Sequence, residues 1–223
     1  MLGYYLIGLI AFVGSLLIQG WLRNTYETWS KKANASGLSG RDAALSILQA
    51  NGINDVKVEM VQGVLTDHYD PTKKVVRLSE ANYNRASVAA MAVAAHEVGH
   101  AIQHARAYAP LQWRTALLPI ASIGSQWGPM LAIFGLFFGG GPNFLLNLGI
   151  ILFSAAVVFH LVTLPIEFDA SRRALVQLNE LGIVTQQDSS GARSVLTAAA
   201  MTYVAAAATS IMYLLYFIMQ SRR

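Results

Sequence analysis

Three long stretches of this 223-residue chain contain no charged side chain: residues 1–22, 115–166 and 194–221. About 20 apolar residues make a helix long enough to cross a bilayer. The middle stretch is about twice that length, and strong turn formers, Gly139-Gly140-Gly141-Pro142-Asn143, interrupt it near its centre. We therefore expect a single helix in each outer stretch and a helical hairpin in the middle one, which makes four membrane crossings.

The composition supports a membrane protein. Hydrophobic residues make up 54% of the chain and charged residues 13%, whereas a soluble protein has about 25% charged residues. The net charge of +4 is modest, so we expect the lipid bilayer and no nucleic acid as a partner. The absence of cysteine excludes disulfides, thiolate ligands and cysteine catalysis. Residues 1–22 lack the basic start and the small-residue cleavage site of a signal peptide, which favours an uncleaved span.

The basic residues predict the orientation of the spans. Of the 16 Lys and Arg residues, all but Arg222 and Arg223 lie within residues 23–114 or 172–193, and positive residues favour the cytoplasmic side. We expect a first span at 1–22, a cytoplasmic region at 23–115, a hairpin at 116–164, a cytoplasmic helix at 165–193 and a fourth span at 194–221. Because the hairpin crosses the membrane twice, the two polar segments must share one face.

The first polar segment predicts a small α+β region. Ser39 and Asp42 resemble a helix cap before residues 43–50, and Asn51-Gly52 is a helix stop. Residues 56–61 alternate like a strand, residues 75–78 repeat that character, and residues 67–71 between them are rich in turn formers, so we expect a small antiparallel β-ribbon. The alanine-rich residues 85–108 favour one continuous helix.

That helix carries a metal-binding pattern, His96-Glu97-Val98-Gly99-His100. Residues four apart share one helix face, so His96 and His100 can bind one Zn²⁺ ion, with Glu97 beside them as general base for an activated water. Peptide hydrolysis is the implied reaction. The alternative is an ordinary amphipathic helix, but three unsatisfied polar groups in an apolar helix would cost several kcal/mol. We therefore favour metal ligation.

A catalytic zinc needs a third protein ligand, and the candidates are His104, His68, His160, Glu167 and Asp169. An unbroken helix places His104 roughly 12 Å from His96, too far to share one ion. Glu167 is favoured because it is the first charge after the hairpin, opens a helix on the same membrane face as the motif, and can complete a His₂Glu site. The alternative role of Glu167 is a favourable charge in the first turn of a helix that begins at Pro165.

The other candidates have weaker predicted roles. Asp169 lies on a different helix face from Glu167 and could support a ligand or the structure. His160 precedes Glu167 by seven residues and could point into the site, although a structural histidine explains it equally well. His68 and Tyr69, in the expected ribbon turn, could orient substrate or stabilise an oxyanion, but turn formation explains them better.

Four segments resemble, in their order and spacing, the neutral zinc metallopeptidases of bacterial membranes, the YugP type, and the resemblance extends over nearly the whole chain. The segments are Leu65-Thr66-Asp67-His68-Tyr69-Asp70-Pro71, Val76-Arg77-Leu78-Ser79, Ala95-His96-Glu97-Val98-Gly99-His100-Ala101-Ile102-Gln103 and Leu164-Pro165-Ile166-Glu167-Phe168-Asp169-Ala170-Ser171. The resemblance implies a plasma-membrane enzyme of the gluzincin kind, with His96, His100 and Glu167 as zinc ligands and Glu97 as base. Many gluzincins carry an acid four residues after the ligand Glu, where this chain has Ser171.

The predicted fold is therefore a mainly α membrane protein with about four spans and a gluzincin-like cytoplasmic zinc-peptidase region. The predicted activity is a zinc endopeptidase that cuts membrane-proximal or unfolded protein segments. An intramembrane site-2-type protease is disfavoured because the chain has no Asp-Gly pair. A non-catalytic metal-binding scaffold for membrane partners remains the alternative. Small residues in 198–208 would permit packing against a second copy or another membrane protein.

Overall fold

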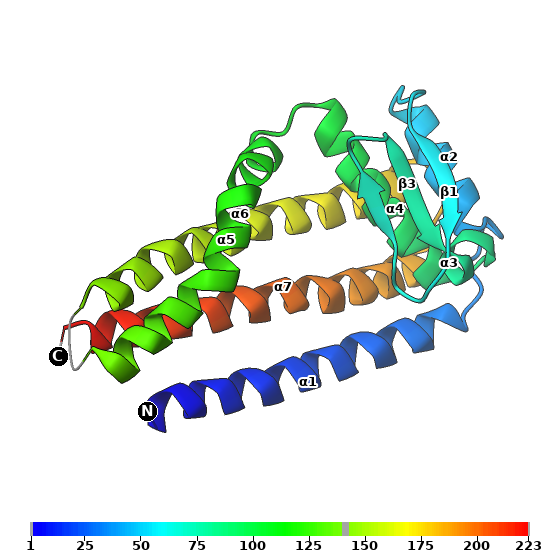
Figure 1. The fold of residues 1–223 in the computed structure, drawn as a ribbon. Coiled ribbons are helices and arrows are strands. Elements are labelled where there is room, and N and C mark those ends of the chain that lie inside the picture. The colour runs from blue at the N-terminus through cyan, green and yellow to red at the C-terminus, as the bar shows by residue number, and fades with distance from the viewer. Residues whose placement is uncertain (1, 140–142, 223) are drawn as a thin grey trace. The chain divides into compact units, whose positions relative to one another are not determined.

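The computed structural model describes residues 2–139 and 143–222. The elements in chain order are α1 (Leu2–Ser30), α2 (Gly40–Ala50), β1 (Lys57–Val61), β2 (His68–Asp70), β3 (Val75–Ser79), α3 (Glu80–Asn84), α4 (Val88–Ala105), α5 (Ala109–Phe138), α6 (Phe144–Glu180) and α7 (Gln186–Gln220) (Figure 1). Four of these helices, α1, α5, α6 and α7, are long and apolar enough to cross a membrane. The expected spans are thereby confirmed as helices. Gly140, Gly141 and Pro142 of the expected hairpin turn lie outside the described residues.

The chain divides into two compact units. One comprises Met1–Ile18, Ala109–Pro165 and Thr202–Arg223, and we call it the span unit. The other comprises Gln19–Tyr108 and Ile166–Met201, and we call it the site unit because it contains the metal motif. Each unit has a buried apolar core of its own, described separately below.

Small residues bring the helices of the span unit close together. A Cβ atom added to Gly124 of α5 would overlap the carbonyl oxygen of Leu152 on α6, and one added to Gly149 of α6 would overlap the backbone nitrogen of Ala132 on α5. Glycine is common at such membrane helix contacts because it allows the two backbones to approach. Fully buried Leu146 belongs to the same core.

The site unit is built around the alanine-rich helix α4. In Figure 1, strands β1 and β3 lie side by side next to α4 and α2. The core draws apolar side chains from α2, β3, α4, α6 and α7, and fully buried members include Ile47, Leu78, Met91 and Leu178. Burial of these side chains removes apolar area from water, which is the main stabilising term of such a core.

The start and end of α2 agree with the sequence. The Ser39 hydroxyl accepts a hydrogen bond from the backbone N–H of Asp42, which confirms the expected cap of α2. Asn51 ends α2 and Gly52 follows with a φ of +69°, a conformation that glycine adopts without strain. The metal helix α4 is shorter than the expected 85–108, because Ser87 caps its start and Ala107 leaves the helical region with a φ of +49°.

The expected antiparallel ribbon is wrong. β1 and β3 pair in parallel, and β2 pairs with the other side of β3 in antiparallel fashion, so the sheet order is β1-β3-β2. Residues 68–70 were expected to turn, but they form a strand; the turn itself follows Asp70. The Asp70 carboxylate accepts hydrogen bonds from the backbone N–H groups of Thr72 and Lys73 and thereby closes that turn.

The expectation that a new helix begins at Pro165 is also wrong. Helix α6 runs without interruption from Phe144 to Glu180, with Pro165 inside it. Proline removes one helical hydrogen bond but fixes a φ that a helix can use. Glu167 consequently lies in a helix interior, where the favourable charge of a first turn does not apply.

Candidate metal centre

The two histidines of the motif lie on one face of α4. Their imidazole ring centroids are 4.8 Å apart and the ring planes are inclined by 84°. The one-turn spacing of His96 and His100 produces this arrangement directly. Glu97, the residue between them nearest to His96, is only 8% exposed.

Gly99 explains how a second helix reaches the histidines. A Cβ atom added to Gly99 would lie 2.5 Å from the carbonyl oxygen of Ala170 on α6 and 3.1 Å from its Cα. Only glycine therefore permits this contact between α4 and α6. Glu167 lies about one turn before Ala170 on α6, and this close approach directs it toward the motif.

The Glu167 carboxylate lies between the two imidazoles. Its Oε2 atom is 3.4 Å from Nε2 of His96 and 3.6 Å from Nε2 of His100. The three candidate ligand atoms all lie within 4.8 Å of one another. A tetrahedral zinc with bonds of about 2.0–2.1 Å would separate its ligand atoms by about 3.3 Å. The two distances from the Glu167 oxygen are close to that value.

The same oxygen lacks a hydrogen-bond partner. Glu167 is 3% exposed, and among the described residues its Oε2 is the buried side-chain atom without a hydrogen bond. The contacts to the imidazoles are too long to count as hydrogen bonds. A buried carboxylate oxygen without a partner is costly unless a cation accompanies it. The donor set of two nitrogens and one carboxylate oxygen is one that zinc accepts.

Each imidazole is held at its other nitrogen. The Nδ1 atom of His96 lies 3.1 Å from Oγ of Ser171 on α6. The Nδ1 atom of His100 lies 3.0 Å from Oε1 of Gln103, and because that oxygen only accepts, Nδ1 of His100 must carry the proton. Ser171 stands four residues after Glu167, where many gluzincins carry an acid. Its hydroxyl is the group that contacts His96.

Gln103 connects His100 to α6. Its side chain is fully buried, and its amide nitrogen donates to the Ile166 carbonyl at 2.8 Å and to Oδ2 of Asp169 at 2.9 Å. Asp169 also pairs with Arg172 at 2.6 Å and Arg173 at 2.5 Å. Asp169 thus supports His100 through Gln103, a residue that the sequence analysis overlooked. One feature of the sequence could have identified Gln103: it is a lone amide side chain in an apolar helix, three residues after His100.

The charges around His100 favour its protonated form when no metal is bound. Burial lowers the pKa of this imidazole, but the Glu167 carboxylate facing Nε2 and the charge of Glu97 outweigh burial and raise the pKa above its ordinary value. Two carboxylates therefore create a strongly cation-favouring site around the two rings.

His104 and Tyr69 form a separate pair. The Tyr69 hydroxyl lies 2.8 Å from Nδ1 of His104, and His104 is not a member of the candidate metal group. Burial, followed by the charges of Asp55 and Asp70, raises the pKa of Tyr69 to about 12. The pair attaches strand β2 to the C-terminal end of α4.

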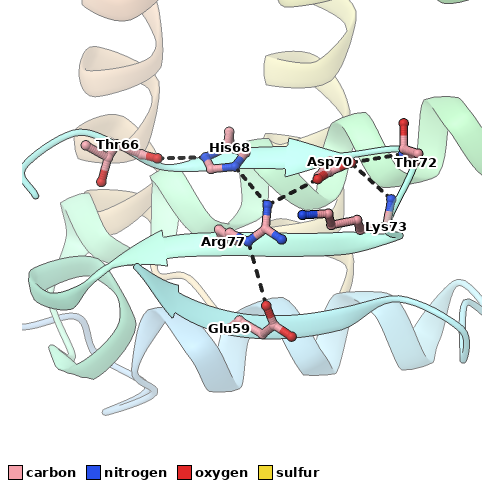
Figure 2. Close-up of polar contacts among 7 residues, drawn as sticks. All are labelled: Glu59, Thr66, His68, Asp70, Thr72, Lys73 and Arg77. Atoms are coloured by element: carbon pink, nitrogen blue, oxygen red, sulfur yellow. Dashed lines mark hydrogen bonds and ion pairs between the residues drawn. The ribbon is translucent and has the colours of Figure 1, made fainter. Parts of the chain in front are cut away.

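His68 projects from strand β2 with Asp70, on the face opposite Tyr69, as strand alternation requires. Figure 2 shows its contacts: Nδ1 lies 2.8 Å from the Thr66 carbonyl and Nε2 lies 3.3 Å from the Arg77 guanidinium. Arg77 also pairs with Asp70 at 3.2 Å and with Glu59 at 3.7 Å. The structure thus places His68 in a surface ion-pair network that joins the three strands. His160 lies on α6 within the span unit and outside the group of three.

Comparison with known proteins identifies the family of the chain. Residues 4–222 match the family described as "Putative neutral zinc metallopeptidase". The chain is 46% identical over 211 residues, 94% of its length, to a Bacillus subtilis protein called "Putative membrane protease YugP", of which the match covers 93%. No solved structure matches. The chain belongs to this family of neutral zinc metallopeptidases.

Proposed function

We propose that this protein is a membrane-bound zinc endopeptidase whose zinc is held by His96, His100 and Glu167. The observation that carries the proposal is the buried Oε2 of Glu167, which has no hydrogen-bond partner and faces both Nε2 atoms. The description of the family supports zinc as the metal and peptide hydrolysis as the reaction class. Ser171 and Gln103 contact the Nδ1 atoms of His96 and His100. These contacts orient the rings so that both Nε2 atoms face the Glu167 carboxylate.

Glu97 is the proposed general base. It lies beside His96 on α4 and is largely buried, which strengthens its electrostatic interactions. When bound, zinc supplies the Lewis acidity that polarises a peptide carbonyl and acidifies a water molecule. The Glu97 carboxylate takes a proton from that water and returns it to the amine that leaves. Ser171 and Gln103 keep the imidazoles in place throughout.

The proposed substrates are membrane-proximal or unfolded protein segments on the cytoplasmic side of a bacterial plasma membrane. The support comes from the distribution of Lys and Arg, which favours cytoplasmic polar segments, and from the four apolar helices that surround these segments in sequence. A gluzincin-like arrangement is part of the same proposal, because the third ligand is a glutamate from a second helix. A homo-oligomer or a membrane-protein partner is compatible with it.

The test combines metal analysis with cleavage of an unfolded membrane-protein substrate by the full-length, detergent-purified protein. We expect Glu97→Gln to retain zinc and lose cleavage by about 100-fold or more, since a positioned general base contributes about 10²–10⁴-fold. Glu167→Gln should lose zinc itself, because an amide binds zinc less well than a carboxylate.

Glu180→Gln is the matched control, because Glu180 is an exposed acid near the end of the same helix. It should leave both zinc content and cleavage unchanged. Equal cleavage by the wild type and Glu97→Gln would sink the peptidase assignment and favour a non-catalytic metal-binding scaffold. Full zinc content in Glu167→Gln would mean that a residue other than Glu167 is the third ligand.

A further inference from the structure

A hollow of the site unit lies between α1 and α7. It encloses about 430 Å³, and its walls combine two indole rings, one guanidinium and five hydroxyl or amide side chains: Trp21, Asn24, Thr25, Thr28, Trp29, Arg193, Ser194 and Thr197. We call it the Arg193 groove. None of these lining residues is acidic, so the Arg193 guanidinium is the one charged group among them, beside two indoles and several hydroxyl and amide groups.

The walls of the Arg193 groove are firmly packed. A Cβ atom added to Gly191 of α7 would overlap the ring of Trp29 on α1, so the two helices touch at this point. Val195, one turn further along α7, is buried with Tyr26 of α1, and Trp29 packs against that cluster. The groove is therefore part of the folded unit and not a gap between loosely placed helices.

Arg193 brings an unneutralised charge to the groove. It is exposed, and within residues 2–139 and 143–222 it forms no ion pair. The ammonium group of Lys32 lies 4.1 Å from the centre of the Trp29 ring, which places a second cation beside the same wall. A neighbouring hollow shares Arg193 and Thr197 and is also lined by Arg172, which pairs with Asp169, and by the acid Glu180. The lining of the Arg193 groove has a cation and no acid, which suits an anion.

The chain positions of the lining residues put the groove at two span boundaries. Trp21 lies at the end of the charge-free residues 1–22, and Arg193 directly precedes the charge-free residues 194–221. Tryptophan and arginine at span ends are typical of the bilayer interface, where lipid phosphates are found. Positive charge, donors and interfacial indoles thus meet at one hollow.

We propose that the Arg193 groove binds the headgroup of an anionic phospholipid. The guanidinium of Arg193 binds the phosphate, for which its planar geometry is suited. Hydroxyl groups such as those of Thr25 and Thr197 face the glycerol part of the headgroup, and Trp21 packs on the apolar part of the lipid. This site is independent of the metal centre and of the peptidase activity.

The test measures binding of phosphatidylglycerol to the full-length, zinc-loaded protein in detergent, by native mass spectrometry and by the shift in melting temperature. Wild type should bind phosphatidylglycerol at least ten-fold more tightly than phosphatidylcholine. Arg193→Gln should abolish that preference and Arg193→Lys should restore most of it. Thr197→Phe keeps the charge but fills the groove, and should also weaken binding by ten-fold or more.

Arg23→Gln is the matched control, because Arg23 lies at the same boundary on α1 but is not among the residues that line the groove, and it pairs with Glu27 at 3.2 Å. It should change lipid binding less than two-fold. Equal losses in Arg23→Gln and Arg193→Gln would overturn the proposal in favour of general surface charge. Equal protection by inorganic phosphate would overturn it in favour of a free phosphate site, and a disulfide-linked dimer of Thr197→Cys, in a chain without other cysteines, would do so in favour of a second copy.

Discussion

Replacing Gln103 should weaken zinc binding without touching a ligand. The substitution Gln103→Met keeps the approximate volume of this fully buried side chain but removes three hydrogen bonds, to Nδ1 of His100, the Ile166 carbonyl and Asp169. The Nδ1–H of His100 then has no partner, so the ring can rotate or change tautomer. Loss of such a supporting contact typically lowers metal affinity by about 10–100-fold.

That loss corresponds to about 1.4–2.7 kcal/mol of binding free energy. It is measured as the zinc dissociation constant of the full-length protein in competition with a chelator, so the result does not depend on turnover. Gln49→Met is the control, because Gln49 is exposed on α2 and its side chain is remote in sequence from the motif. A wild-type dissociation constant for Gln103→Met, in a variant that melts near the wild-type temperature, would refute the role assigned to Gln103.

Two further predictions concern packing and ionisation. Gly99→Ala should lower the unfolding free energy by about 1–3 kcal/mol and reduce zinc content, because the new Cβ would lie 2.5 Å from the Ala170 carbonyl oxygen. The control Gly14→Ala places its Cβ in open space and should have neither effect. Full zinc content in Gly99→Ala would contradict the close approach of α4 and α6. The raised pKa of Tyr69, about 12 against 10.0, means that its stabilising contribution is complete below pH 10 and is lost as pH rises through 12. In difference absorbance titrations against Tyr69→Phe, a tyrosinate signal already complete at pH 10.5 would contradict that burial.

Local patterns in the sequence account for the elements that depend on neighbouring residues. Charge-free stretches predict the long apolar helices because a bilayer leaves a backbone few other ways to satisfy its hydrogen bonds. Ser39 before Asp42 predicts the start of α2, since a cap is made within one turn of chain. The spacing of His96 and His100 fixes their common face for the same reason.

The pairing of strands could not be read in this way. Residues 57–61 and 75–79 have strand character, but whether they run parallel depends on what lies between them and on which face α4 covers. The short strand at His68–Asp70 pairs with one edge of β3 in antiparallel fashion, and β1 pairs with the other edge in parallel. Turn-forming residues concealed that strand, because Asp70 serves both the strand end and the turn.

The membrane class, the number of long apolar helices, the motif on α4 and the choice of Glu167 could all be predicted, because each follows from composition or from spacing along the chain. The meeting of Glu167 with both imidazoles could not, since it needs the contact of Gly99 with Ala170 between two helices. The contacts of Ser171 and Gln103 with the two rings are likewise visible only in the folded chain. Such partners are chosen by the three-dimensional approach of distant segments, which no local pattern encodes.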